Sequence, residues 1–395
     1  MQKGSSMLNI VLLSCGHALN DFYNNFLPVL LPVLIVKFDF SLAISGLLVM
    51  VLSITANLMQ PFFGYYFDRH NMGRVLLFAI PLGGVIICSV GYLTEQYMVF
   101  FMLALLGITV SSFHPLASSI IGKITDDESR GKSMSYFVAG GNIGFAAAPI
   151  VVVCFLEHLQ IEQLPWLTLP AFLLLAGYLW SGVYKIPSAT RSADDEMEQP
   201  SIVSALKNWS VVKLNLAMGL RCWTHMSIST FLPLLILKNG YSAVAGGLIL
   251  TLFLMGSSLG GLIGGYLGDK LNHKRVLVVS LGISAVPAYL FLSSEAIDAV
   301  SLIALFLSGA LVQAGQPSSI VWSQRLMPEF TGVASGMMMG MSFGLGSIGA
   351  AITAAIGDVI GLSASLLLSI LPVALGCLLI VITPYEEKGS VTTNG

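Results

Sequence analysis

Residues 64–76 read GYYFDRHNMGRVL, and residues 265–277 read GYLGDKLNHKRVL. The two stretches start 201 residues apart, about half the length of the 395-residue chain, and seven of their thirteen positions are identical. Each charged stretch follows a long apolar segment and precedes another one. A charged loop that recurs at half the chain length, between segments long enough to cross a bilayer, predicts a duplicated membrane protein. This narrows the function to solute transport.

The composition is that of a chain that lies almost entirely inside a membrane. Hydrophobic residues make up 55% of the sequence, charged residues only 10%, and the mean hydropathy is +0.85. A soluble domain carries about 25% charged residues. Apolar runs of span length fill nearly the whole chain, which leaves almost no sequence for a catalytic or DNA-binding domain. The five cysteines stand singly in apolar runs and are interpreted as packing residues.

The hydropathy pattern predicts an all-α polytopic membrane protein with twelve transmembrane helices in two six-helix bundles. The predicted bundles are residues 1–184 and 209–395, the second with a short cytoplasmic tail. Residues 185–208, which include an acidic run at 194–198, form the predicted cytoplasmic linker. The predicted spans are 8–36, 42–67, 74–93, 98–122, 134–156, 166–184, 211–237, 243–268, 275–293, 299–322, 332–357 and 362–382.

Lysine and arginine residues determine the expected orientation in the membrane. If both termini lie in the cytoplasm, only Lys37 and Lys238 fall in outer loops. Such an excess of basic residues on one side is typical of the cytoplasmic side. The basic residues placed there are Arg69, Arg74, Lys123, Arg130, Lys132, Lys185, Arg191, Lys207, Lys270, Lys274, Arg275 and Arg325.

The duplication extends beyond the charged loops. The triplet Phe-Leu-Pro occurs at residues 26–28 of the first span and at residues 231–233 of the seventh. The pair His114 and Pro115 in the fourth span corresponds to Gln316 and Pro317 in the tenth. Because six spans return the chain to the same side of the membrane, the halves are expected to be parallel repeats about an axis along the membrane normal.

Five ionisable residues lie inside the predicted spans and away from the span ends, where a charge needs a partner or a water-filled cavity. They are His17, Asp21, His114, Arg221 and His225. His17 and Asp21 are four residues apart and share one helix face, as do Arg221 and His225 in the symmetry-related seventh span. The pattern predicts two polar walls of one central site, with His17 and His114 at the same level of the membrane.

Asp21 is the only acidic residue inside a predicted span, and Arg221 is the only intramembrane side chain that always keeps a positive charge. We predict that Asp21 takes and releases a coupling proton, and that Arg221 holds an anionic substrate or competes for Asp21. His17 and His114 are candidate proton relays, because histidine titrates near neutral pH. A structural alternative is a static Asp21–Arg221 pair, or an Asp21 that is hydrogen-bonded to His17 and merely ties helices together.

The repeated loops predict a gating role. Asp68 and Asp269 stand at the cytoplasmic ends of the second and eighth spans, where a carboxylate can cap the next helix or pair with basic side chains. Such a cluster would latch the two halves on the inner side and break when they rock apart. The alternative is that the basic residues reflect membrane topology alone. The predicted gating residues are Gly64, Asp68, Arg69, Arg74, Asp269, Lys270 and Arg275.

The whole chain resembles the major facilitator superfamily, because GYYFDRHNMGR at residues 64–74, echoed at residues 265–275, is similar to the signature loop of that superfamily. Within the superfamily, the chain resembles the fosmidomycin-resistance family. The motifs that carry this resemblance are HALND at residues 17–21, QP at 60–61, SFHP at 112–115, GGNIG at 140–144 and GVASG at 332–336.

This resemblance implies a bacterial inner-membrane exporter that exchanges a drug for protons. It also implies that Asn20, Asp21, His114 and a basic residue of the seventh span, here Arg221, matter for function. Fosmidomycin is an anionic phosphonate, which suits Arg221. The fifth span departs from drug/proton antiporters, because Pro149 is followed by IVVV instead of a pair of glycines. This departure keeps import open as an alternative direction.

The sequence therefore predicts a proton-coupled secondary transporter that exports a small, fosmidomycin-like compound by alternating access. The alternative is a proton-coupled importer of a sugar or an organic acid. The absence of a Walker-type loop favours secondary over primary transport, and no convincing nucleophile or metal set suggests an enzyme. No cofactor or metal is expected, because the proton gradient supplies the energy.

The predicted partners are a small-molecule substrate, protons and the lipid bilayer. No nucleic acid is expected, and the protein is predicted to act as a monomer in the bacterial inner membrane. The predicted substrate-binding residues are Asn20, Asn24, Arg221, His225 and Gln316.

Overall fold

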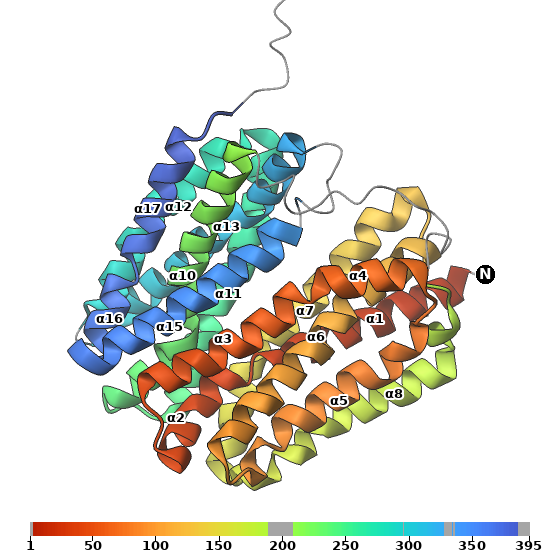
Figure 1. Ribbon diagram of the computed structural model, residues 1–395, viewed down its shortest axis with the longest axis horizontal. Coiled ribbons are helices and arrows are strands. Elements are labelled where there is room, and N and C mark those ends of the chain that lie inside the picture. Colours follow the sequence, from red (N-terminus) through yellow and green to blue (C-terminus); the bar gives the residue numbers. More distant parts are fainter. Residues whose placement is uncertain (1–2, 189–207, 295, 328–333, 335, 386–395) are drawn as a thin grey trace, which may run out of the picture.

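The computed structural model describes residues 3–188, 208–294, 296–327, 334 and 336–385, and every element in these ranges is a helix. Most of the predicted linker, 185–208, lies outside the described residues. Figure 1 shows the helices as two bundles that lie side by side, the first from the first half of the chain and the second from the second half. Twelve segments of the described chain are long and apolar enough to cross a membrane, which confirms the predicted fold class.

The helices of the first half are α1 (Lys3–Asn24), α2 (Leu27–Phe38), α3 (Leu42–Leu58), α4 (Gln60–Arg69), η1 (Gly73–Val75), α5 (Leu76–Cys88), η2 (Val90–Tyr92), α6 (Gln96–Ile124), α7 (Asp127–His158), η3 (Ile161–Thr168), α8 (Leu169–Ser181) and η4 (Val183–Lys185). Those of the second half are α10 (Trp209–Lys238), α11 (Ala243–Lys270), α12 (His273–Leu292), α13 (Ala299–Leu326), η6 (Met337–Met341), α15 (Ser342–Ile360), α16 (Leu362–Leu368) and α17 (Leu371–Ile382). The predicted spans agree with the observed ones to within five residues at each end.

Proline interrupts spans at positions that the hydropathy pattern did not mark. Helices α1 and α2 form one span, and the helix breaks between them at Asn25 and Phe26, just before Pro28. Pro61 stands in the same way at the start of α4. Proline lacks the amide hydrogen and crowds the preceding turn, so a helix tolerates it best in its first turn. Pro233, the counterpart of Pro28, lies inside the continuous helix α10, so the two repeats differ here.

Glycines allow the backbones within each half to touch. Gly256, Gly260 and Gly264 of α11 face α13, and a Cβ atom at any of them would overlap a carbonyl oxygen of that helix. In the first half, Gly144 of α7 lies in the same way against the carbonyl group of Ala18 in α1. Small residues at such spacing let transmembrane helices approach closely. As a result, α7 forms a tight wall behind α1.

The contacts between the two halves include a helix cap at one face of the molecule. Twelve spans return the chain to its starting side, so α1 begins and α17 ends on one face, here called the terminal face, and the opposite face is the distal face. At the distal face, Asp358 of α15 accepts hydrogen bonds from the backbone amides of Leu42 and Ala43 at the start of α3, both at 2.8 Å. These amides have no partner within their own helix, so Asp358 caps α3 from the other half.

Asp358 also corrects the predicted boundary of the eleventh span. That span was predicted to end at residue 357, but the observed span continues to residue 360 and includes Asp358 in its last turn. Two other helices of opposite halves, α7 and α11, meet near the same face, where Gly247 lies against Pro149. Figure 1 shows α3 next to α15 along this junction between the bundles.

Candidate functional site

Three ionisable side chains from two helices of the first half meet inside the membrane-spanning region. His17 Nε2 on α1 lies 3.2 Å from Asp21 Oδ2, one turn further along the same helix. His114 Nε2 on α6 lies 3.4 Å from Asp21 Oδ1. The two imidazole rings are 4.9 Å apart between centroids, which confirms that the histidines lie at one level. The Asp21 side chain, 18% exposed, bridges them where water has restricted access.

Helix α7 determines the orientation of His17. Its Nδ1 atom lies 2.7 Å from the carbonyl oxygen of Phe137, and its ring stacks on the Phe137 ring at 4.1 Å. A carbonyl oxygen can only accept a hydrogen bond, so Nδ1 carries the hydrogen. A neutral His17 therefore presents a bare Nε2 atom to Asp21. The contact between Nε2 and Oδ2 becomes a hydrogen bond when one further proton sits on either atom.

Asn20, a predicted substrate-binding residue, lies within this cluster. Its Nδ2 atom is 3.2 Å from His114 Nε2 and 3.4 Å from Asp21 Oδ1. His114 Nε2 accepts a hydrogen bond from Asn20 when it carries no hydrogen, and donates to Asp21 when it does. The geometry thus allows two hydrogen-bond arrangements that differ by one proton. Asn24, one turn further along α1, has a buried Oδ1 atom without a hydrogen-bond partner in the described part of the chain.

The same three ionisable side chains have the spacing of a metal site. The ligand atoms of His17, Asp21 and His114 all lie within 4.8 Å of one another. Two imidazoles and a carboxylate are common zinc ligands. The sequence predicts no metal here, and a proton on these side chains satisfies the same contacts. A transport experiment with and without a chelator distinguishes a metal from a proton at this cluster.

A second cluster surrounds Arg221 of α10, which is fully buried. Its Nη1 atom donates to Gln313 Oε1 at 2.5 Å and to the carbonyl oxygen of Val312 at 3.2 Å. Its Nη2 atom donates to Gln316 Oε1 at 2.6 Å and lies 2.9 Å from Cys222 Sγ. The Nε atom has no hydrogen-bond partner among the described residues. Every contact of the guanidinium is therefore with a neutral group, and no described carboxylate forms an ion pair with it.

The other predicted residues of the second half lie at different distances from the guanidinium. Gln316 touches it, whereas His225, one turn further along α10, places its Nε2 atom 3.3 Å from Ser257 Oγ. Gln313 was not predicted. It stands three residues before Gln316 on one face of α13, and that spacing was the signal that could have found it.

The two clusters remain separate. Among the described side chains, Asp21 pairs with His17 and His114, and no ion pair joins it to Arg221. The static Asp21–Arg221 pair considered from the sequence is therefore not formed in this structure, whereas the contact between Asp21 and His17 is present. Each half carries its own charged group with its own partners.

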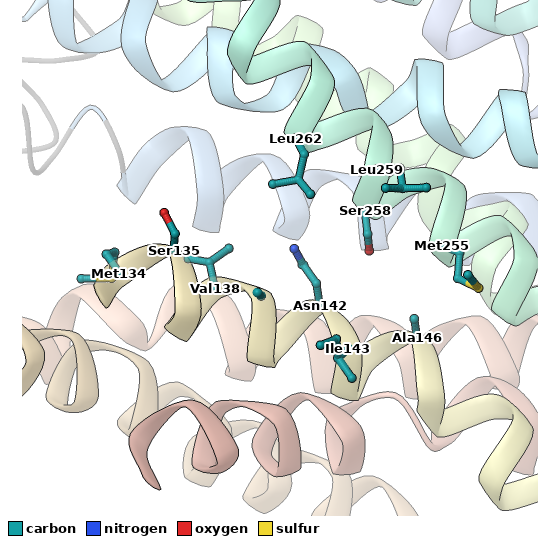
Figure 2. Close-up of a pocket in the computed structure, with 11 residues that line it drawn as sticks. Met134, Ser135, Val138, Asn142, Ile143, Ala146, Met255, Ser258, Leu259 and Leu262 are labelled. Carbon is teal, nitrogen blue, oxygen red and sulfur yellow. The ribbon is translucent and has the colours of Figure 1, made fainter. Parts of the chain in front are cut away.

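A cavity of about 580 Å³ lies between α7 of the first half and α11 of the second. Figure 2 shows Asn142 of α7 and Ser258 of α11 pointing into the space between these helices, and most of the other lining side chains are apolar. The volume falls in the range of small-molecule sites, about 300–1,000 Å³. Asp21 and Arg221 are not among the lining residues. The cavity is therefore a space between the halves whose lining includes neither charged group.

Helix α7 stands between the cavity and the proton-binding candidates. Phe137 and Gly141 face His17, and a Cβ atom at Gly141 would overlap the imidazole ring. The next residue in each case, Val138 and Asn142, lines the cavity. One helix thus contacts both the ionisable cluster and the space where a small molecule fits.

The second repeated loop lacks the predicted ion pairs of Asp269 among the described side chains. Asp269 makes no ion pair within 4.0 Å with Lys270 or Arg275 among the described side chains, and the side chain of Asp68 lies outside that set. Instead, the Arg69 guanidinium stacks on the Tyr65 ring at 3.9 Å, and Lys270 lies over the equivalent ring of Tyr266 at 4.5 Å. Both basic side chains therefore contact an aromatic ring of their own helix. A latch between the halves would instead need contacts from one half to the other.

The glycines of these loops contact their own half of the molecule. A Cβ atom at Gly64 would lie 3.6 Å from Pro115 of α6, and one at Gly265 would lie 3.5 Å from Pro317 of α13. Arg74 belongs to η1, and the backbone amide of Arg275 donates to Asn272 Oδ1 at 3.3 Å. The repeated sequence thus produces repeated local contacts, and its gating role remains a prediction.

Known transporters match this chain along most of its length. A family model described as the Major Facilitator Superfamily matches residues 13–246 and 214–395. The chain is 24% identical to the fosmidomycin resistance protein of Escherichia coli (strain K12), over 85% of this chain and 83% of that protein. It is 26% identical to the uncharacterised MFS-type transporter YfnC of Bacillus subtilis (strain 168), over 98% and 96%. It is 22% identical to the sialic acid transporter NanX of Escherichia coli (strain K12), over 95% and 93%.

Solved structures show the same fold. A bacterial homologue of the human lysosomal transporter Spinster, inward-facing and unoccupied, superposes with a TM-score of 0.78 at 14% identity, over 97% of this chain and 98% of that one. The nucleoside transporter NupG also gives a TM-score of 0.78, at 16% identity, over 96% and 100%. The family match spans nearly the whole sequence and agrees with twelve spans in two bundles. The chain therefore belongs to the Major Facilitator Superfamily of membrane transporters.

Proposed function

We propose that this protein is a proton-coupled secondary transporter that exports a small anionic compound, as a drug/proton antiporter that works by alternating access. The observation that supports proton coupling is the Asp21 carboxylate held between His17 and His114. Intramembrane carboxylates and histidines are typical of proton relays. The similarity to a fosmidomycin resistance protein supports export of a fosmidomycin-like substrate.

The ionisable cluster supports a simple coupling step. When Asp21 is ionised, a protonated His17 or His114 can donate a hydrogen bond to it. When Asp21 takes a proton, its negative charge disappears and its carboxyl group can itself donate to His17 Nε2. Because Arg221 keeps its charge, protonation of the first half alone changes the charge balance between the halves. We propose that this change selects which face of the transporter is open.

Arg221 is the proposed anion-binding residue. A buried cation whose partners are all neutral is costly, and an anionic substrate would supply the missing negative charge. Asn20, Asn24, His225 and Gln316 are retained as proposed polar contacts of the substrate around the same central region. The contact of Gln316 with Arg221 supports its inclusion, at 2.6 Å.

We propose that the terminal face is cytoplasmic and that the membrane is the bacterial inner membrane, because most basic residues belong to that side. The rocking units would be residues 1–184 and 209–395, joined by the linker 185–208 in a monomer. In this orientation, the hydrogen bonds of Asp358 to α3 close the outer face and must break when that face opens. The loops at residues 64–74 and 265–275 would then form the inner gate.

The alternative is a proton-coupled importer of a sugar or an organic acid. It is supported by the 22% identity to a sialic acid transporter over nearly the full length. An acidic sugar would suit Arg221 as well as a phosphonate does. The charged clusters are compatible with both directions, so direction must be measured.

The test is growth of an efflux-deficient bacterium that expresses this protein, across fosmidomycin and a panel of other toxic anions. Resistance that disappears in Asp21→Asn at matched membrane expression is the expected result. Treatment with a chelator should leave resistance unchanged, because the proposed coupling ion is a proton. No protection by the well-expressed wild-type protein would reject export and favour uptake assays with labelled acidic sugars and organic acids.

A further inference from the structure

The side chain of Gln313 occupies one of two binding positions on the Arg221 guanidinium. The distance from Nη1 to Gln313 Oε1 is 2.5 Å, and that from Nη2 to Gln316 Oε1 is 2.6 Å. Two oxygens, one on each terminal nitrogen, match the arrangement in which arginine binds both oxygens of a carboxylate or phosphonate. Both oxygens here belong to neutral amides of the protein itself.

The two glutamines are held to different degrees. Gln316 is buried, and its Nε2 atom donates to the carbonyl oxygen of Met338 at 3.1 Å, so hydrogen bonds at both ends of its amide fix it. Gln313 is only partly buried, and its one side-chain hydrogen bond among the described residues is the contact with Arg221. Rotation of Gln313 away from the guanidinium therefore costs one hydrogen bond, whereas the same movement of Gln316 costs two.

Gln313 of α13 lies against α11, one of the two helices that line the cavity. Its stem packs beside Gly261 of α11, where a Cβ atom would be 3.7 Å from Gln313 Cγ. Gly261 stands one helical turn from Ser258, which points into the space between α7 and α11 in Figure 2. Because Arg221 is fully buried and Gln313 is partly exposed, a molecule that approaches the guanidinium past Gln313 would meet the glutamine first.

The positive charge of Arg221 favours replacement of the Gln313 amide oxygen by an oxygen of an anion. The Arg221 guanidinium has neutral partners alone, and its Nε atom is unpartnered in the described structure. The hydrogen bond from Arg221 to Gln313 has one charged partner, whereas a bond to an anion has two and gains a Coulomb attraction between them. An anionic oxygen is therefore a better partner for Nη1 than the amide oxygen that occupies the position.

We propose that Gln313 is a displaceable cover of an oxyanion subsite. An oxygen of a carboxylate or phosphonate group on the substrate replaces Gln313 Oε1 on Nη1, while Gln316 stays in place on Nη2. Gln313 thereby sets the preference for anions, because a neutral molecule gains nothing by displacing it. This inference rests on the proposed function in that it takes the transported molecule to be an anion.

The test is equilibrium binding to the purified full-length protein in lipid nanodiscs, measured by calorimetry. The probes are fosmidomycin, benzoate and the neutral analogue benzamide. Gln313→Glu places a permanent carboxylate on the guanidinium, so both anions should bind at least about tenfold more weakly, while benzamide is unaffected. Gln313→Ala removes the cover and should bind both anions as tightly as the wild type or more tightly. The matched control is Gln324→Glu, the same change about three turns further along α13, which should leave all binding unchanged.

Accessibility of Arg221 gives a second readout that needs no substrate. Phenylglyoxal labelling of Arg221, followed by peptide mass spectrometry, should be faster in Gln313→Ala than in the wild type and slower again when benzoate is present. Equal labelling rates in the wild type and Gln313→Ala would contradict the cover. Equal anion affinity in the wild type and Gln313→Glu, or no anion binding to either the wild type or Gln313→Ala, would overturn the proposal. Equilibrium binding does not depend on proton coupling, so failure of the Asp21→Asn transport test leaves these results unaffected.

Discussion

The two halves of the molecule place their intramembrane charges in opposite surroundings. In the first half, Asp21 is shared between His17 and His114, and all three side chains can exchange protons. In the second half, Arg221 keeps its charge and is surrounded by the amide oxygens of Gln313 and Gln316. Symmetry-related helices thus carry polar groups at the same spacing but with different chemistry. The two helices therefore share the spacing of their polar groups, whereas one half carries a cluster that can titrate and the other a fixed charge.

The largest effect should come from Asp21→Asn, which removes the titrating carboxylate and keeps its size. Proton-driven transport should be abolished, because the cluster can then no longer alternate between charged and neutral states. Anion binding and exchange of substrate without a proton gradient should persist, because Arg221 is untouched. The measurement is transport into proteoliposomes with and without an imposed pH gradient, at equal protein content.

If Asp21→Asn lost anion binding together with transport, the proposed division of roles between the two halves would be contradicted. Such a loss would show that Asp21 is a substrate ligand or a structural residue. Thermal unfolding of the variant distinguishes these two outcomes, since a structural residue would also lower the melting temperature.

Arg221→Lys tests the fixed charge in the second half. Lysine keeps the positive charge but cannot present two parallel N–H groups to Gln313 and Gln316, or to an oxyanion. Loss of one charge-assisted hydrogen bond should weaken anion binding by about tenfold, while the pH dependence of transport stays that of the wild type. Calorimetry and a pH profile of transport check the two parts. A shifted pH profile would mean that Arg221 acts on the proton step as well.

Gly141→Ala tests the wall behind the proton cluster without replacing an ionisable residue. A methyl group at this position would overlap the His17 ring, so the ring must move away from Asp21. Proton-driven transport should fall several-fold while anion binding is kept. Gly122→Ala in α6 is the control, because a Cβ atom there meets nothing within 4 Å. Equal losses in both variants would show that the effect reflects helix propensity and not His17.

The sequence predicts the fold better than it predicts the partners of each charge. Spans, repeats and the meeting of His17 with His114 follow from hydropathy and helical spacing, because both are local properties. The spacing from Gln313 to Gln316 marks a shared helix face, but the contact of Gln313 with Arg221 and the cap made by Asp358 could not be found in this way, because both depend on which residue of another helix lies opposite. Asp358, in particular, caps a helix of the other half, and its partners stand 315 and 316 positions away in the sequence.

The smallest effect is expected for His225→Gln. This variant tests whether a side chain of the second half takes part in proton transfer. His225 is buried beside Ser257 and Phe253, and its Nε2 atom lies 3.3 Å from Ser257 Oγ. Glutamine can keep a hydrogen bond to this hydroxyl, so stability should fall by about 1 kcal/mol or less. The pH profile of transport should stay unchanged, whereas His17→Gln should alter it, because His17 touches Asp21. If His225→Gln altered the pH profile as strongly as His17→Gln, protons would be handled in both halves and the contrast between a titrating half and a fixed half would fail.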